Sequence, residues 1–114
     1  SPCIYYGTEM GMAGDNDPDC RKPMDWSKED GPVWQRVHKL IKFRLAHDKT
    51  LSEGKIKLSV TENRLIEVIR EGKESIHAYF NTTKNDVKLD GKAELSQDFE
   101  KGILAPKGFV IMVD

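Results

Sequence analysis

The spacing of apolar positions changes along the chain, and each change marks a different structural element. Residues 2–6 form an unbroken apolar run that Gly7 ends, which is typical of a short strand buried on both faces of a parallel sheet. A buried helical turn is the alternative, but a run this short that stops at glycine favours the strand. Such a strand needs parallel neighbours, and the rest of the pattern supplies none, so we expect a further part upstream.

The segment from Gly7 to Gly31 has no regular period. A loop of this length inside a compact domain is usually functional or disordered. Large apolar side chains, which disordered linkers rarely carry, are spaced through it at Met10, Met12 and Trp26. We therefore expect an ordered loop that is held against the rest of the protein.

A helical period follows the loop. Pro32 suits the first helical position, and Asp30 or Gly31 can cap the helix. Apolar residues then recur at helical spacing, and basic residues fill much of the remainder. The apolar positions are Val33, Val37, Leu40, Ile41 and Leu45. His47 and Lys49 near the end complement the helix dipole, so the pattern predicts a helix over residues 32–49.

After residue 49 the period becomes two, which indicates strands. We predict strands over residues 55–60, 64–71, 75–81, 87–89, 93–95 and 108–113. Hairpin turns are expected at Gly72-Lys73 and at Asp90-Gly91. Short strands separated by glycine, asparagine and aspartate indicate a small antiparallel sandwich or barrel. The chain therefore divides into a strand–loop–helix part over residues 1–49 and an all-β domain over residues 50–114.

Composition narrows the class of protein. Apolar residues make up 38% and charged residues 32% of the 114 residues, and the formal net charge is −1. This near-neutral balance argues against nucleic acid or an anionic membrane as a partner. No apolar run is long enough to cross a bilayer. Because the chain opens with neither Met nor a signal-like segment, we expect it to begin somewhere other than a natural N-terminus.

Cysteine usage favours a reducing compartment. Cys3 and Cys20 are the two cysteines, too few for the disulfide framework of a small secreted domain. We expect free thiols and a cytoplasmic protein, although a single Cys3–Cys20 bridge stays open.

The chain carries no recognisable metal or cofactor motif. Asp15, Asp17 and Asp19 imitate the start of an EF-hand loop, but Cys20 stands in place of the required glycine and Trp26 in place of the bidentate glutamate. The three histidines have no metal-site spacing, and His77 is expected to be exposed on its strand. We therefore expect neither a metal ion nor a cofactor.

Asp17 and Arg21 are the candidates for ligand binding. They can form a local ion pair, or together they can grip a polyol, because the guanidinium offers a fork of donors and the carboxylate a pair of acceptors. Glu9 and the loop aspartates offer carboxylates for glycoside chemistry, but nothing in the sequence fixes their separation. The residues alone leave these readings open.

Residues 1–26 resemble the α-amylase superfamily. The part Pro-x-Ile-Tyr-Tyr-Gly-x-Glu, residues 2–9, is shared broadly there. The part Asn-Asp-Pro-Asp-Cys-Arg-x-Pro-Met-x-Trp, residues 16–26, is similar to neopullulanases, cyclomaltodextrinases and maltogenic amylases. Thr8 stands where the superfamily commonly has Asp. The resemblance implies that the chain holds the last strand, loop and helix of a (β/α)₈ barrel, followed by a C-terminal antiparallel β-sandwich.

The same resemblance implies roles for a few residues. Asp17 and Arg21 match a pair that hydrogen-bonds a glucose unit of an α-glucan. The superfamily's catalytic carboxylates lie on earlier strands and have no counterpart here, so the expected function is that of an inactive C-terminal fragment of a retaining α-glucan hydrolase. The alternative is an independent β-sandwich module that binds carbohydrate or protein. An isolated fragment should expose apolar residues and self-associate.

Overall fold

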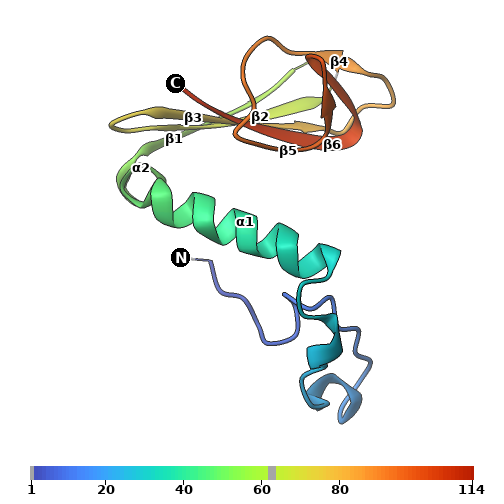
Figure 1. The fold of residues 1–114 in the computed structure, drawn as a ribbon. Helices are drawn as coiled ribbons and strands as arrows, with labels where there is room; N and C mark the ends of the chain where they lie inside the picture. The colour runs from blue at the N-terminus through green and yellow to red at the C-terminus, as the bar shows by residue number, and fades with distance from the viewer. Residues whose placement is uncertain (1, 62–63) are drawn as a thin grey trace. The chain divides into compact units, whose positions relative to one another are not determined.

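The computed structural model describes residues 2–61 and 64–114. The chain divides into two compact units, Ser1–Ala46 and His47–Asp114. Figure 1 shows a loop and a long helix in the first unit and an antiparallel sheet in the second. None of the helices in the described ranges combines the length and apolarity needed to cross a membrane.

The first unit differs from the expectation at residues 2–6. The structure assigns these residues to no strand, because a strand requires a paired neighbour and the described strands all belong to the sheet of the second unit. The loop that follows holds two short 3₁₀ helices, η1 (Asp19–Arg21) and η2 (Trp26–Lys28). Helix α1 (Pro32–Ala46) begins at the predicted proline.

The predicted helix over residues 32–49 is in fact two helices. α1 ends at Ala46, and α2 (Asp48–Glu53) starts after His47, whose backbone leaves helical geometry at φ −112° and ψ 22°. The side chain of Ser52 donates to the Asp48 carbonyl oxygen at 2.7 Å within α2. His47 also forms a hydrogen bond from Nδ1 to Glu74 Oε1 at 2.8 Å, so the break in the helix carries a contact to the sheet.

The second unit is an antiparallel sheet of six strands. They are β1 (Lys55–Val60), β2 (Leu65–Glu71), β3 (Ser75–Asn81), β4 (Val87–Lys88), β5 (Leu95–Glu100) and β6 (Ile103–Val113). The order is β1-β2-β3-β6-β4, and β5 also pairs with β6. β6 is therefore the central strand, and its early part curls so that β4 stands over the β2–β3 hairpin (Figure 1).

The curled sheet encloses its own core. Leu104 and Val110 of β6 are fully buried, and Leu65 and Met112 complete the buried cluster. Tyr79, Val87, Leu89, Ala93 and Phe99 pack against this cluster. The predicted antiparallel β-sandwich is confirmed, since two parts of one sheet face each other across apolar side chains.

One of the two predicted hairpins is correct. β2 and β3 pair from Leu65↔Asn81 to Glu71↔Ser75 around the turn that starts at Gly72. The hairpin at Asp90-Gly91 is wrong, because β4 and β5 both pair with β6 and not with each other. The tight turn lies instead at Lys101-Gly102, where both residues have positive φ, 51° and 78°, as a type I′ turn requires.

Candidate functional site

The loop of the first unit starts with a compact turn. Gly7 has φ +83°, and its carbonyl oxygen accepts hydrogen bonds from the amides of Met10 at 3.2 Å and Met12 at 2.9 Å. Met10 is buried, and the sulfur of Met12 lies 3.4 Å from the amide nitrogen of Asp25. The methionines therefore tie the start of the loop to its end, as expected for an ordered loop.

Asp17 and Arg21 form a bidentate ion pair. Arg21 Nε lies 2.9 Å from Asp17 Oδ1, and Arg21 Nη2 lies 3.1 Å from Asp17 Oδ2. Both side chains are well exposed, at 73% for Arg21 and 61% for Asp17. The peptide bond between Asp17 and Pro18 is cis. Since the pair lies in the open, both groups can also meet a ligand, and the ion-pair reading is compatible with the polyol reading.

Cys20 makes a third contact with the same carboxylate. Its thiol donates to Asp17 Oδ1 at 3.0 Å. This hydrogen bond to Asp17 raises the pKa of the Cys20 thiol, because the thiol must give up the donated proton when it ionises. Cys3 and Cys20 are both exposed free thiols.

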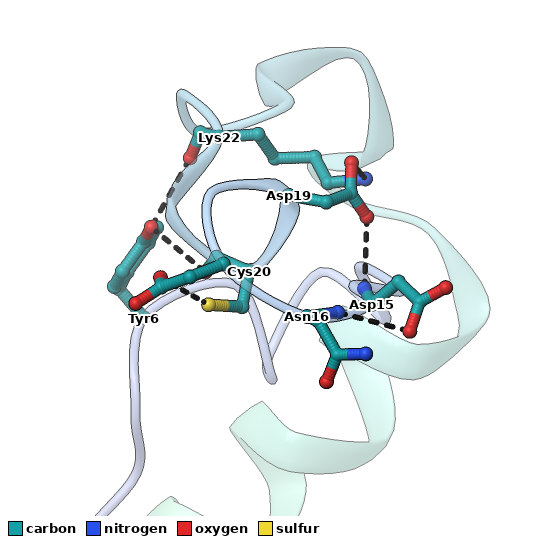
Figure 2. A network of polar contacts seen from close by, with 7 residues as sticks. Tyr6, Asp15, Asn16, Asp19, Cys20 and Lys22 are labelled. Atoms are coloured by element: carbon teal, nitrogen blue, oxygen red, sulfur yellow. Dashed lines mark hydrogen bonds and ion pairs between the residues drawn. The ribbon is translucent and has the colours of Figure 1, made fainter.

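The turn that carries these residues is anchored from several sides (Figure 2). The Tyr6 hydroxyl lies 3.2 Å from the Lys22 carbonyl oxygen and 3.4 Å from the Cys20 carbonyl oxygen. The Asp15 amide donates to Asp19 Oδ2 at 2.8 Å, and Lys22 Nζ lies 3.1 Å from Asp19 Oδ1. These contacts, the Asp15 amide first, lower the pKa of Asp19. The three EF-like aspartates are thus engaged with donors of the loop itself.

The side chains of this site are suited to binding a ligand. A carboxylate and a guanidinium side by side present acceptors and donors at a spacing that suits vicinal hydroxyls. Glycoside hydrolysis would in addition need a second carboxyl group across the bond; of the other loop acids, Asp19 is paired with Lys22 and Asp25 accepts from Ser27. Glu9 Oε2 is buried and has no hydrogen-bond partner among the described residues. Among residues 2–61 and 64–114 no group of His, Cys, Asp or Glu could hold a metal ion.

The aromatic candidates divide into two kinds. Tyr5 and Trp26 are exposed, whereas Trp34 stacks on His38 within α1 with ring centroids 4.7 Å apart. Tyr6 stands beside Tyr5, with ring centroids 4.8 Å apart, and uses its hydroxyl on the loop.

The prediction that His77 is exposed is wrong. It is half-buried rather than exposed, with Nδ1 3.1 Å from Glu67 Oε1, because the face of the sheet that it occupies carries polar partners. Burial raises the pKa of Glu67, but hydrogen bonds from His77, Tyr79 and Ser59 outweigh it and lower the pKa overall. Burial and the same carboxylate raise the pKa of Tyr79 to about 12. This cluster belongs to the β unit.

Sequence reasoning missed two residues of the loop site. The position of Cys20, three residues after Asp17 and one before Arg21, places it on the same turn, and this spacing could have identified it. For Tyr6, no sequence signal shows that its hydroxyl reaches the carbonyl groups of residues 20 and 22.

Relatives with known names cover most of the chain. "Intracellular maltogenic amylase" of Bacillus subtilis (strain 168) is 39% identical over 107 residues, which are 90% of this chain and 18% of the relative. "Cyclomaltodextrinase" of Geobacillus thermopakistaniensis (strain MAS1) is 33% identical over 94 residues, 78% of this chain and 16% of the relative. "Neopullulanase 2" of Thermoactinomyces vulgaris is 60% identical over 30 residues, 26% of this chain and 5% of the relative. The chain thus spans less than a fifth of these proteins. No protein-family model matches it.

Solved structures give the same result for the fold. Maltogenic amylase from S. marinus superposes with a TM-score of 0.78 at 30% identity, covering 99% of this chain and 17% of that one. The cyclic α-maltosyl-(1→6)-maltose hydrolase of Arthrobacter globiformis gives a TM-score of 0.71 at 25% identity, covering 96% of this chain and 26% of that one. By sequence and by fold, the chain belongs to the α-amylase superfamily, in the group of maltogenic amylases, cyclomaltodextrinases and neopullulanases.

Proposed function

We propose that this chain is the C-terminal part of a retaining α-glucan hydrolase and that Asp17 and Arg21 hydrogen-bond a glucose unit of the substrate. The observation that carries the proposal is the exposed bidentate pair of these two residues, on a loop whose motif matches the family. The names of the relatives support maltodextrins, cyclodextrins or pullulan as substrates.

The chemistry itself falls to residues outside this chain. A retaining glycosidase needs a nucleophilic carboxylate and a general acid about 5 Å apart across the scissile bond. In a (β/α)₈ barrel such groups lie at the C-terminal ends of several strands. We propose that Asp17 and Arg21 provide one wall of that site, that the 114-residue chain alone is inactive, and that its β unit supports the barrel. The proposed location is the cytoplasm, supported by the relative named as intracellular.

The test compares hydrolysis of maltotriose, cyclodextrin and pullulan by this chain and by the longer protein that contains it. Activity only in the longer protein is expected. In that protein, Asp17→Ala and Arg21→Ala should each lower kcat/KM by roughly tenfold or more, since a charge-assisted hydrogen bond contributes about 1.5–3 kcal/mol. Lys28→Ala is the matched control, because Lys28 makes a similar short-range ion pair with Asp25 at 3.8 Å on the next turn. Equal effects of all three changes would overturn the binding role.

The alternative is a β-sandwich module that binds carbohydrate or protein without catalysis. Its prediction is different: the unit His47–Asp114 would bind glucan by itself, with no contribution from the loop. Isothermal titration of maltotriose into the chain and into its Asp17→Ala variant separates the two, because equal measurable affinities would favour the module.

A further inference from the structure

We infer that Cys20 is a positioning residue, which holds the Asp17 carboxylate in the orientation that receives the substrate, and that Tyr6 fixes the turn on which both residues sit. This inference rests on the proposed function of Asp17 and Arg21. It adds two residues to the site and assigns the thiol a role as a hydrogen-bond donor.

The ion pair alone does not hold Asp17 in place. Both partners are exposed, and an exposed ion pair contributes little because water screens the charges and the long arginine side chain loses entropy when it is fixed. The guanidinium of Arg21 stands at the end of a flexible side chain and can move together with the carboxylate. Its contact therefore fixes the two groups relative to each other and leaves them free relative to the backbone.

The thiol supplies the missing link to the backbone. A single carbon joins the Cys20 sulfur to its Cα, so the sulfur cannot move far from η1. It contacts Oδ1 of Asp17 at 3.0 Å, the oxygen that Arg21 Nε also reaches, at 2.9 Å. Among the residues that the structure describes, Oδ2 has one hydrogen-bond partner, Arg21 Nη2 at 3.1 Å. The donors thus gather on Oδ1 and leave acceptor capacity on Oδ2, beside the remaining N–H groups of Arg21, for the hydroxyls of a sugar.

The backbone beneath Cys20 is itself held. The single proton of the Tyr6 hydroxyl is shared between the carbonyl oxygens of Cys20 and Lys22, at 3.4 and 3.2 Å, as Figure 2 shows. Gly14 also approaches so closely that an added Cβ would lie 3.1 Å from the Cys20 Cα. Tyr6 and Gly14 thus restrict the backbone of Cys20. Because the thiol contacts the carboxylate, this restriction also limits the orientation of Asp17.

The contact between thiol and carboxylate can be tested in the 114-residue chain. The hydrogen bond to Asp17 raises the pKa of the Cys20 thiol, and alkylation requires the thiolate. Iodoacetamide labelling, followed for each cysteine by mass spectrometry, should therefore show that Asp17→Asn speeds the labelling of Cys20 severalfold. Cys3, exposed and far along the chain, is the internal reference. An unchanged ratio of the two rates would overturn the contact.

The positioning role is tested in the longer protein through steady-state kinetics on maltotriose. Cys20→Ala should raise KM severalfold and leave kcat nearly unchanged, because it loosens a binding group and removes no reacting group. Cys20→Ser, which keeps a short hydroxyl donor, should restore much of the loss. Tyr6→Phe should resemble Cys20→Ala, and Cys3→Ala should match the unmodified protein.

The outcomes separate this inference from the proposed function. If Asp17→Ala leaves kcat/KM unchanged, the proposed function fails, and the positioning role fails with it. If Asp17→Ala lowers kcat/KM while Cys20→Ala and Tyr6→Phe do not, the proposed function stands and the positioning role is overturned. A Cys20→Ser variant as impaired as Cys20→Ala would also count against the role of the thiol as a donor.

Discussion

Asn81 is the polar residue on which the β unit depends most. It is 1% exposed, and its side-chain nitrogen donates to the carbonyl oxygens of Asn85 and Leu104, each at 2.9 Å. Its side-chain oxygen accepts from the Thr83 amide at 3.0 Å. One amide thus joins the end of β3, the following turn and the central strand β6. Asn81→Ala removes all three hydrogen bonds at once.

The size of the effect follows from burial. The carbonyl oxygen on Leu104 belongs to a fully buried residue, and a buried acceptor left without a donor costs about 1–3 kcal/mol. The two bonds to the turn are nearer to water and contribute about 0.5–1 kcal/mol each. Asn81→Ala should therefore destabilise the β unit by about 3 kcal/mol, a large part of the 5–15 kcal/mol that holds a domain folded. Taking an m value of about 1.5 kcal/mol per molar urea, the midpoint falls by about 2 M.

The assay is urea unfolding followed by far-UV circular dichroism near the strand signal. Tryptophan fluorescence serves as a separate probe, because Trp26 and Trp34 both lie in the first unit. Asn85→Ala is the control: it removes the same amide from an exposed residue of the same turn and keeps the backbone carbonyl. If Asn81→Ala lowered the midpoint no more than Asn85→Ala, the account of the buried amide would be refuted.

Three further predictions concern pH, turn chemistry and association. The pKa of Glu67 lies below its ordinary value of 4.5 in the folded chain, so its contribution to stability is present above pH 4.5 and is lost as the pH falls through the lower folded pKa. Glu67→Gln should therefore make the urea midpoint depend less on pH between about pH 6 and pH 3. An unchanged pH dependence would contradict this. Lys101 has φ 51° in the type I′ turn with Gly102, a conformation that asparagine adopts more readily than lysine. Lys101→Asn should therefore raise the urea midpoint by the equivalent of about 0.5 kcal/mol, and a lower urea midpoint would count against the turn assignment. Ile41 is one of several exposed apolar residues of the first unit, so the chain should form dimers or larger oligomers, measured by light scattering. Ile41→Lys should weaken this association, and a monomer at all concentrations would rule the association out.

The pattern of apolar residues predicted the first three strands of the sheet almost to the residue. The strands at residues 55–60 and 75–81 have the predicted bounds, and the third, Leu65–Glu71, differs by one residue. Polar and apolar side chains alternate along residues 55–60, and alternation is the signal that strands leave in a sequence. The other two strands are runs rich in β-branched and aromatic residues.

The prediction failed where the chain bends. The strands predicted over residues 93–95 and 108–113 are wrong in their bounds, since β5 is Leu95–Glu100 and β6 begins at Ile103. Asp98 and Lys107 adopt positive φ and Pro106 lies within β6, so the strand pattern is interrupted there. A proline inside a strand argues against the strand, yet here it lies between Leu104 and Phe109, where the pairing with β5 shifts register. The curl that closes the sandwich thus depends on residues that read as breaks.

The loop site shows the same division. The family motif identified Asp17 and Arg21, and their separation by four residues allowed an ion pair, which the structure contains. The contacts of Tyr6 and Cys20 depend on how the loop returns on itself over fourteen residues, and no local spacing encodes such a return. The motif therefore indicates the candidate binding residues, whereas the hydroxyl contact of Tyr6 appears only in three dimensions.

The two units hold their structure by different means, and this difference explains why the loop needs so many polar contacts. The β unit has a closed apolar core around Leu104 and Val110, which fixes its strands without help. Among the described residues of the first unit, Met10 is the only large apolar side chain that is buried. Hydrophobic burial therefore contributes less to the conformation of the loop than to that of the β unit, and directional contacts from Tyr6, Asp19 and Cys20 add to the contacts of the methionines. A loop ordered by hydrogen bonds to its own backbone keeps its outer face free, which is the property that a sugar-binding wall requires.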